Sequence, residues 1–110
     1  MTPEQARRVL GLVGLGLRAR TAVVGTEQVR AAAKKGTLVL ALVAADASEH
    51  SLAKLRPLLA ARRVRVIEGL AAAQLGAAGG RNQTAAIGVI DGALARGILG
   101  VVDLGTTRPA

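Results

Sequence analysis

The chain contains no cysteine, phenylalanine, tyrosine or tryptophan. The absence of cysteine excludes disulfides, thiolate metal sites and a cysteine nucleophile. The absence of aromatic rings means that the core must be built from Ala, Val, Leu and Ile, and that no base can stack on a side-chain ring. Because most proteins that bind single-stranded nucleic acid use such stacking, an RRM, a cold-shock or an ordinary OB-fold mode of binding is disfavoured.

Long apolar segments are absent as well. The longest strongly apolar run, LVLALVAA at 38–45, is much shorter than the roughly 20 residues that span a bilayer. The residues after Met1, TPEQARR, lack the apolar centre of a signal peptide. We therefore expect a cytoplasmic protein that does not enter a membrane.

Acidic residues are few. The 7 Asp+Glu residues stand against 15 Lys+Arg residues and give a net charge of +8. On a domain of this size the surplus indicates a polyanionic partner, with nucleic acid favoured over an anionic membrane. The alternative is a basic protein whose arginines only maintain its solubility.

The length of 110 residues predicts one domain, 1–110, and 51% hydrophobic residues suffice for a core. Hydrophobic periodicity predicts helices at about 4–17, 27–35, 48–63, 71–78 and 92–99. Short apolar runs predict strands at about 22–25, 38–44, 64–67 and 85–91. This alternation predicts a three-layer α/β/α sandwich around a mixed sheet of about four strands.

Two segments are less regular. Pro57 lies inside the third predicted helix and indicates either a kink or a later helix start. After the last predicted helix, Val101 and Val102 are strand-like, and we expect a frayed tail from about 103.

Catalytic residues are not apparent. The one histidine, His50, lies in the polar segment DASEHS and is expected on the surface near a helix start. Asp46 and Asp91 each follow a buried strand, where they either bind a ligand or cap the next helix. No metal-ligand spacing is present. We expect no enzyme and no cofactor, and a ligand cavity at these two aspartates would favour the alternative of an enzyme or a nucleotide binder.

Two groups of glycines resemble phosphate-binding loops only superficially. The group in GLVGLGLR lies within a predicted helix and has no strand before it, and the group in LGAAGGRN ends a helix. Neither contains the Gly-Lys-Ser/Thr of a P-loop. We interpret both as packing and helix-capping glycines.

The segment GTEQVRAAAKKG at 25–36 predicts a helix with complete ends. Thr26 can serve as N-cap and Gly36 as the stop, while cations occupy the last turn. One face of this helix carries Glu27, Arg30, Ala31 and Lys34, and the opposite face is small and apolar.

The first turn of that helix has the chemistry of a nucleic-acid contact. Free N–H groups at Gly25 and Thr26 suit a phosphate. Gln28 can donate and accept, whereas ionised Glu27 can only accept, for example from an exocyclic amino group. From these residues alone, a capped surface helix and an RNA contact remain equally open. Because regular A-form RNA has a major groove too deep and narrow to admit a helix, the expected target is structured RNA with a distorted groove.

Four segments taken together resemble a known family. They are GTEQVRAAAKKG at 25–36, AADAS at 44–48, QLGAAGG at 74–80, and AAIGVID at 85–91 leading into GALARGIL. In order and separation they are similar to the kink-turn RNA-binding ribosomal protein superfamily (L-seven-Ae/L-thirty-e/Gadd-like), especially its small stand-alone bacterial members. The resemblance implies the same three-layer sandwich.

The resemblance places the family's RNA motif, Gly-x-Asn-Glu-x-x-Lys, on residues 25–31. In the family the Asn, Glu and Lys read tandem sheared G·A pairs at a sharp RNA kink. Here these three positions are Glu27, Gln28 and Ala31, so the chain departs from the motif. Gln28 keeps the hydrogen-bonding capacity, and Arg30 can replace the missing cation.

The resemblance also implies a second contact. The loop that packs on a flipped-out nucleotide falls on residues 80–84, which include Arg81, Asn82, Gln83 and Thr84. A Gly pair followed by Arg-Asn-Gln is independently expected to be exposed and suited to phosphates or base edges. Ser48 and Leu52 match the helix start that lines the same pocket.

The sequence therefore predicts a monomeric, non-catalytic protein that binds kink-turn-like structured RNA, including ribosomal RNA, in the ribosome or its assembly. The alternative is a protein–protein adaptor on the ribosome or the transcription machinery with a degenerate RNA motif, which the changes at Glu27 and Ala31 favour. The predicted RNA-binding residues are Gly25, Thr26, Glu27, Gln28, Arg30, Ala31, Lys34, Ser48, Leu52, Arg81, Asn82, Gln83 and Thr84.

Overall fold

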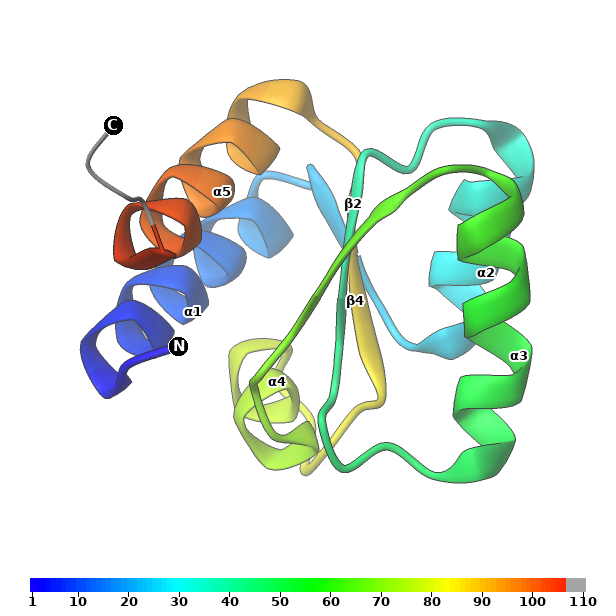
Figure 1. Ribbon diagram of the computed structural model, residues 1–110, viewed down its shortest axis with the longest axis horizontal. Coiled ribbons are helices and arrows are strands. Elements are labelled where there is room, and N and C mark those ends of the chain that lie inside the picture. The colour runs from blue at the N-terminus through cyan, green and yellow to red at the C-terminus, as the bar shows by residue number, and fades with distance from the viewer. Residues whose placement is uncertain (107–110) are drawn as a thin grey trace.

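The computed structural model describes residues 1–106, and within them five helices alternate with four strands (Figure 1). The helices are α1 (Pro3–Arg18), α2 (Thr26–Lys35), α3 (Glu49–Ala61), α4 (Ala72–Ala78) and α5 (Gly92–Thr106). The strands are β1 (Ala22–Val24), β2 (Leu40–Val43), β3 (Arg65–Glu68) and β4 (Ala86–Val89). The predicted α/β class with a mixed sheet of four strands is confirmed. None of the helices described is long and apolar enough to cross a membrane.

The sheet has the order β1-β4-β2-β3. β2 and β3 are parallel, whereas β4 runs antiparallel to both of its neighbours, β1 and β2. In this register Leu40 lies opposite both Val89 and Arg65, and Ala22 lies opposite Val89. The starts of β1, β2 and β3 and the end of β4 therefore lie together at one end of the sheet.

Helices cover both faces of the sheet. α1, α4 and α5 lie on one face, and α2 and α3 lie on the other (Figure 1). Side chains of β2 alternate between the two layers, since Leu40 and Leu42 pack with the first group and Ala41 and Val43 with the second. The expected core of small aliphatic residues thus forms as two layers on a sheet buried on both sides.

The last helix is longer than the sequence predicts. α5 continues through Val101 and Val102 to Thr106, so the strand-like interpretation of the two valines is wrong. Val101 is buried at helical spacing after Ala95 and Ile98, and this packing outweighs the β propensity of valine. The predicted tail from about 103 is wrong for 103–106, and its remaining part, 107–110, lies outside the described residues.

Helix α3 begins at Glu49, close to the predicted start at residue 48, and continues through Pro57, so of the two alternatives raised by this proline the later helix start is wrong. Ser48 is the N-cap, and its Oγ accepts a hydrogen bond from the Ser51 N–H at 3.1 Å. Pro57 lies on an exposed part of the helix and has no N–H to donate to the carbonyl four residues earlier. The cap fixes the start of α3 at the same end of the molecule as the first turn of α2.

Candidate nucleic-acid interface

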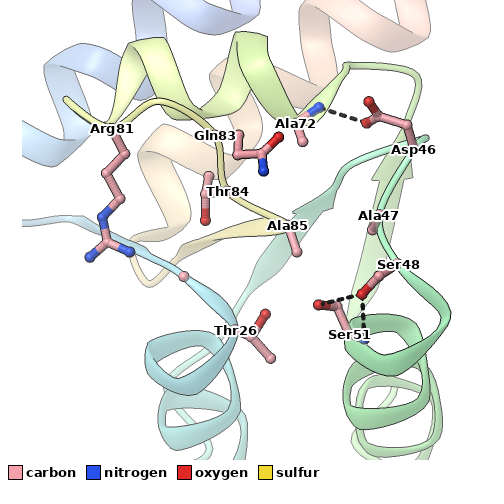
Figure 2. A pocket seen from close by; sticks show the side chains of 11 residues that line it. Thr26, Asp46, Ala47, Ser48, Ser51, Ala72, Arg81, Gln83, Thr84 and Ala85 are labelled. Carbon is pink, nitrogen blue, oxygen red and sulfur yellow. Dashed lines mark hydrogen bonds between the residues drawn. The ribbon is translucent and has the colours of Figure 1, made fainter.

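A pocket of about 470 Å³ opens where β1 and β2 end and β4 begins. Three segments far apart in the sequence form its walls: the start of α2, the connection from β2 into α3, and the loop between α4 and β4 (Figure 2). We call this side of the molecule the pocket end. Of the predicted RNA-binding residues, it brings together Gly25, Thr26, Ser48, Arg81, Gln83 and Thr84.

The start of α2 differs in detail from the prediction. Gly25 is the N-cap, with φ 100°, and Thr26 is the first helical residue, so the prediction of a Thr26 cap is wrong. The Gly25 N–H is not free either, because it donates to the Ala86 carbonyl at 2.9 Å. Within residues 1–106, no side chain caps this helix. The N–H groups of its first turn have no helical carbonyl to bind and remain available as donors at the pocket.

The loop between α4 and β4 is held against α4 by its backbone. The Arg81 N–H donates to the Gly76 carbonyl at 2.7 Å, and the Thr84 N–H donates to the Ala72 carbonyl at 3.1 Å. Gly76 permits this approach, because a Cβ there would lie 2.6 Å from the Gln83 backbone nitrogen. The loop is therefore positioned by close backbone contact with α4.

The side chains of this loop have three different environments. Arg81 reaches across to α2, where a Cβ on Gly25 would lie 3.1 Å from its Nη1 (Figure 2). Gln83 is exposed and lines the pocket, whereas exposed Asn82 does not line it. Thr84 is buried, and its hydroxyl donates to the Ala86 carbonyl at 3.4 Å. The predicted exposure of Arg81, Asn82 and Gln83 is thus confirmed, and the chain turns inward at Thr84, the last residue of the loop.

The connection from β2 into α3 contributes hydroxyl groups and one carboxylate. Ser48 and Ser51 both line the pocket, and the Ser48 Oγ donates to the Ser51 Oγ at 3.2 Å (Figure 2). Leu52, which was expected in this wall, packs instead against the core between α2, α3 and the sheet. The helical turn after the Ser48 cap directs Ser51 to the pocket. The sequence analysis did not include Ser51 among the predicted RNA-binding residues.

The two aspartates that follow buried strands do not form one site. Asp46 lies in the pocket wall, where its Oδ1 accepts from the Ala72 N–H at the start of α4 at 2.7 Å. Asp91 lies at the other end of the sheet, since β4 is antiparallel to β2, and its Oδ2 accepts from the Leu94 N–H at 2.9 Å. Each carboxylate caps a helix, and only Asp46 adjoins the cavity. Within residues 1–106 no group of three or more His, Cys, Asp or Glu side chains could hold a metal ion.

On the outer face of α2, the carboxylate of Glu27 lies between two cations. Its Oε2 lies 3.3 Å from the Lys54 Nζ on α3, and its Oε1 lies 3.5 Å from the Arg30 Nη1. The hydrogen bond and charge of Lys54, with Arg30 adding to them, lower the pKa of Glu27 below its ordinary value of 4.5. Glu27 is therefore ionised near neutral pH and joins α2 to α3. Lys54 has no counterpart in the sequence prediction, because no local spacing relates residue 54 to residue 27.

The remaining predicted residues lie along α2. Gln28 and Ala31 line a second, smaller cavity of about 120 Å³. Lys34 is exposed in the last turn and lies about 12 Å from Thr26, at a rise of about 1.5 Å per residue. Gly36 ends the helix with φ 81°, as predicted. The polar face of α2 is thus continuous from the pocket end to the opposite end of the sheet.

Comparisons with known proteins agree with this architecture. The family model described as "Ribosomal protein L7Ae/L30e/S12e/Gadd45 family" matches residues 7–96. A protein with unknown function from Bacillus halodurans C is 31% identical, with a TM-score of 0.79 over 87% of this chain and 97% of that one. The 15.5kD RNA binding protein of Giardia lamblia is 20% identical, with a TM-score of 0.78 over 94% of this chain and 89% of that one. Among curated protein sequences none matches significantly.

Proposed function

Because the chain belongs to the ribosomal protein L7Ae/L30e/S12e/Gadd45 family, we propose that it is a non-catalytic protein that binds kink-turn-like structured RNA, in the ribosome or its assembly. The observation that carries the proposal is the pocket at which the start of α2, the Ser48 cap and the 81–84 loop meet. The Giardia lamblia structure that shares the fold is titled an RNA binding protein.

The pocket end offers several groups that suit contact with an RNA segment. The uncapped first turn of α2 offers N–H donors at the positive end of a helix, which favours phosphate oxygens. The Arg81 guanidinium lies beside that turn and can donate to two oxygens of a second phosphate group. Ser48 and Ser51 add hydroxyl groups on the opposite wall. A volume of about 470 Å³ lies within the usual size of small-ligand pockets and suits one nucleotide turned out of the stack.

Base recognition is assigned to the exposed side chains of the first turn. Gln28 has both a donor and an acceptor for a base edge. Glu27 offers acceptors only, and its charge is balanced by Lys54 and Arg30. That balance reduces the repulsion between this carboxylate and the RNA phosphates, which otherwise disfavours an acidic residue at this position of the family motif.

Two substitutions on α2 test the proposal. Gln28→Ala removes a base-edge contact and is expected to reduce the preference for a kink-turn RNA over a duplex of equal length. Lys34→Ala removes a cation and is expected to weaken binding to both RNAs by a similar factor. Each difference in affinity is measured by calorimetric titration or gel shift at one salt concentration.

The reverse pattern would contradict the assignment. If Gln28→Ala leaves the preference intact while Lys34→Ala abolishes it, the first turn of α2 does not read bases. Binding to a ribosomal protein that survives nuclease treatment, with no measurable affinity for either RNA, would instead favour a protein–protein adaptor.

A further inference from the structure

Most of the positive charge does not lie at the pocket. The pocket end carries Arg30, Lys54 and Arg81, and these three cations are matched in number by three carboxylates, Glu27, Asp46 and Glu49. The net charge of +8 therefore has to arise elsewhere on the molecule. The pocket alone does not explain why the chain is so basic.

The opposite end of the sheet holds a group of exposed cations. There α1, α2 and α3 end, the strands β1, β2 and β3 begin, and α5 starts (Figure 1). We call this side the basic end, and it is defined by Arg18, Arg20, Lys35, Arg62, Arg63 and Arg65. The 13 residues of α3 separate it from the pocket end by about 20 Å.

These cations are only partly neutralised within the described chain. Arg65 pairs with Asp103 at 3.1 Å, and the ion pairs of residues 1–106 include none of the other five. Among the carboxylates of residues 1–106, Asp91 is the other one beside these cations, and it caps α5. Six cations less these two carboxylates leave a surplus of four charges. Each helix terminus contributes about half a charge, so three C-termini and one N-terminus offset only about one of them.

Two of the arginines occupy backbone positions that suit glycine. Arg20 has φ 64° and Arg63 has φ 56°, and they are the only non-glycine residues with positive φ in the described part of the chain. They follow the ends of α1 and α3, whereas the equivalent position after α2 is Gly36, with φ 81°. Glycine adopts this conformation without steric cost and arginine does not. Arginine at both positions is therefore not explained by the fold of the chain.

We propose that the basic end is a second RNA-binding surface, which holds the phosphate backbone of a double-helical segment. Guanidinium groups bind phosphate oxygens in pairs and without sequence preference. A duplex fits this surface better than a single strand, because the chain has no aromatic side chain on which unpaired bases could stack. The same lack of aromatic anchors disfavours a membrane surface.

The surface adds a second contact to the proposed function. A structured RNA that places its kink at the pocket end can lay a flanking stem or a neighbouring helix against the basic end about 20 Å away. The pocket end then determines which RNA is preferred, and the basic end increases affinity for every RNA that has a helical segment within reach.

The double variant Arg20→Gly/Arg63→Gly tests the surface without harming the fold. Its affinity for a plain RNA duplex is expected to fall about tenfold or more near physiological salt. The slope of log affinity against log salt is expected to decrease by about two, since each phosphate contact contributes about 0.9. Its thermal unfolding midpoint is expected to equal or exceed that of the unsubstituted protein, because glycine relieves the left-handed backbone. If the two arginines only stabilise the fold, the thermal unfolding midpoint of the double variant should instead be lower than that of the unsubstituted protein.

Two further variants serve as matched comparisons. Arg7→Gln/Arg8→Gln removes the same charge from exposed positions near the start of α1, away from the basic end, and is expected to change duplex affinity much less. Arg18→Gln/Arg62→Gln removes two positive charges from the basic end at positions where φ is negative. This second pair is expected to reproduce the loss caused by the glycine pair.

The proposal rests on RNA binding but fails separately from kink-turn recognition. The ratio of kink-turn to duplex affinity is expected to stay constant in both basic-end variants and to fall in Gln28→Ala. If the unsubstituted protein does not prefer the kink-turn RNA, the proposal that the pocket end recognises kinked RNA is contradicted. The measurements of duplex affinity still test the basic end in that case. Equal duplex affinity and salt slope in the basic-end variants and the Arg7/Arg8 control would overturn the second surface. The second surface would also be contradicted if the basic-end variants lose binding to phosphatidylserine vesicles but keep their affinity for the duplex.

Discussion

Glu27 shows what a single residue contributes at the candidate site. Its position on the outer face of α2 follows from helical spacing, and so does its pairing with Arg30 one turn later. Its contact with Lys54 depends on how α3 packs beside α2, which no local pattern in the sequence contains. The same limit applies to Gly25, whose N–H donates to the Ala86 carbonyl of β4, a contact between segments 61 residues apart that no local pattern contains.

A pH-dependent contribution to stability is expected from Glu27. Because its pKa is lowered in the folded state, the carboxylate stabilises the fold above the ordinary value of 4.5, and this stabilisation is lost as pH falls through the lowered pKa. Glu27→Gln should therefore be less stable than the unsubstituted protein at neutral pH, and the difference should vanish well below pH 4.5. Urea unfolding at both pH values measures this. A difference that persists in acid would show that the ion pairs with Lys54 and Arg30 are not its cause.

At the level of elements, the order and class of all nine helices and strands described were predictable from periodicity, because helical stripes and short buried runs are local features. The end of α5 was not predictable, since the burial of Val101 against the rest of the core decides it. The walls of the pocket were predictable only through the family resemblance. Ser51 and Asp46 enter it through the caps that start α3 and α4.

The placement of the 81–84 loop depends on Gly76 in α4. Gly76→Ala would bring a Cβ to 2.6 Å from the Gln83 nitrogen, so the loop backbone must move. We expect a loss of about 1–3 kcal/mol in the free energy of unfolding. We also expect weaker binding of kink-turn RNA, because Arg81 and Gln83 move with the loop. Denaturant unfolding and RNA titration of the same variant measure the two effects.

Gly11→Ala is the matched control. Gly11 is also helical, and a Cβ there meets no atom of the described residues within 4 Å. This substitution should stabilise the protein by about 0.5–1 kcal/mol and leave RNA binding unchanged. If both alanine variants behave alike, the close approach of the loop to Gly76 does not position the site.

At the scale of the whole molecule, the cavity and the excess positive charge lie at different ends. The cavity lies at one end of the sheet, where charges of the two signs are balanced, whereas a surplus of four positive charges lies at the other end. The sequence contains the net charge of +8 but not this separation, which arises because α1, α2 and α3 all end on the same side. In the proposed account, the pocket end recognises a kinked RNA and the basic end attracts any helical RNA.

This division can be tested on the unsubstituted protein by titrating it, near physiological salt, with a kink-turn RNA and with a fully paired duplex of equal length. If the pocket end reads a kinked RNA, the kink-turn should bind at least tenfold more tightly, which corresponds to about 1.4 kcal/mol. The duplex should still bind measurably through the basic end, with an affinity that falls steeply as salt is raised. Equal affinity for the two RNAs would contradict the assignment of the pocket to kink-turn recognition.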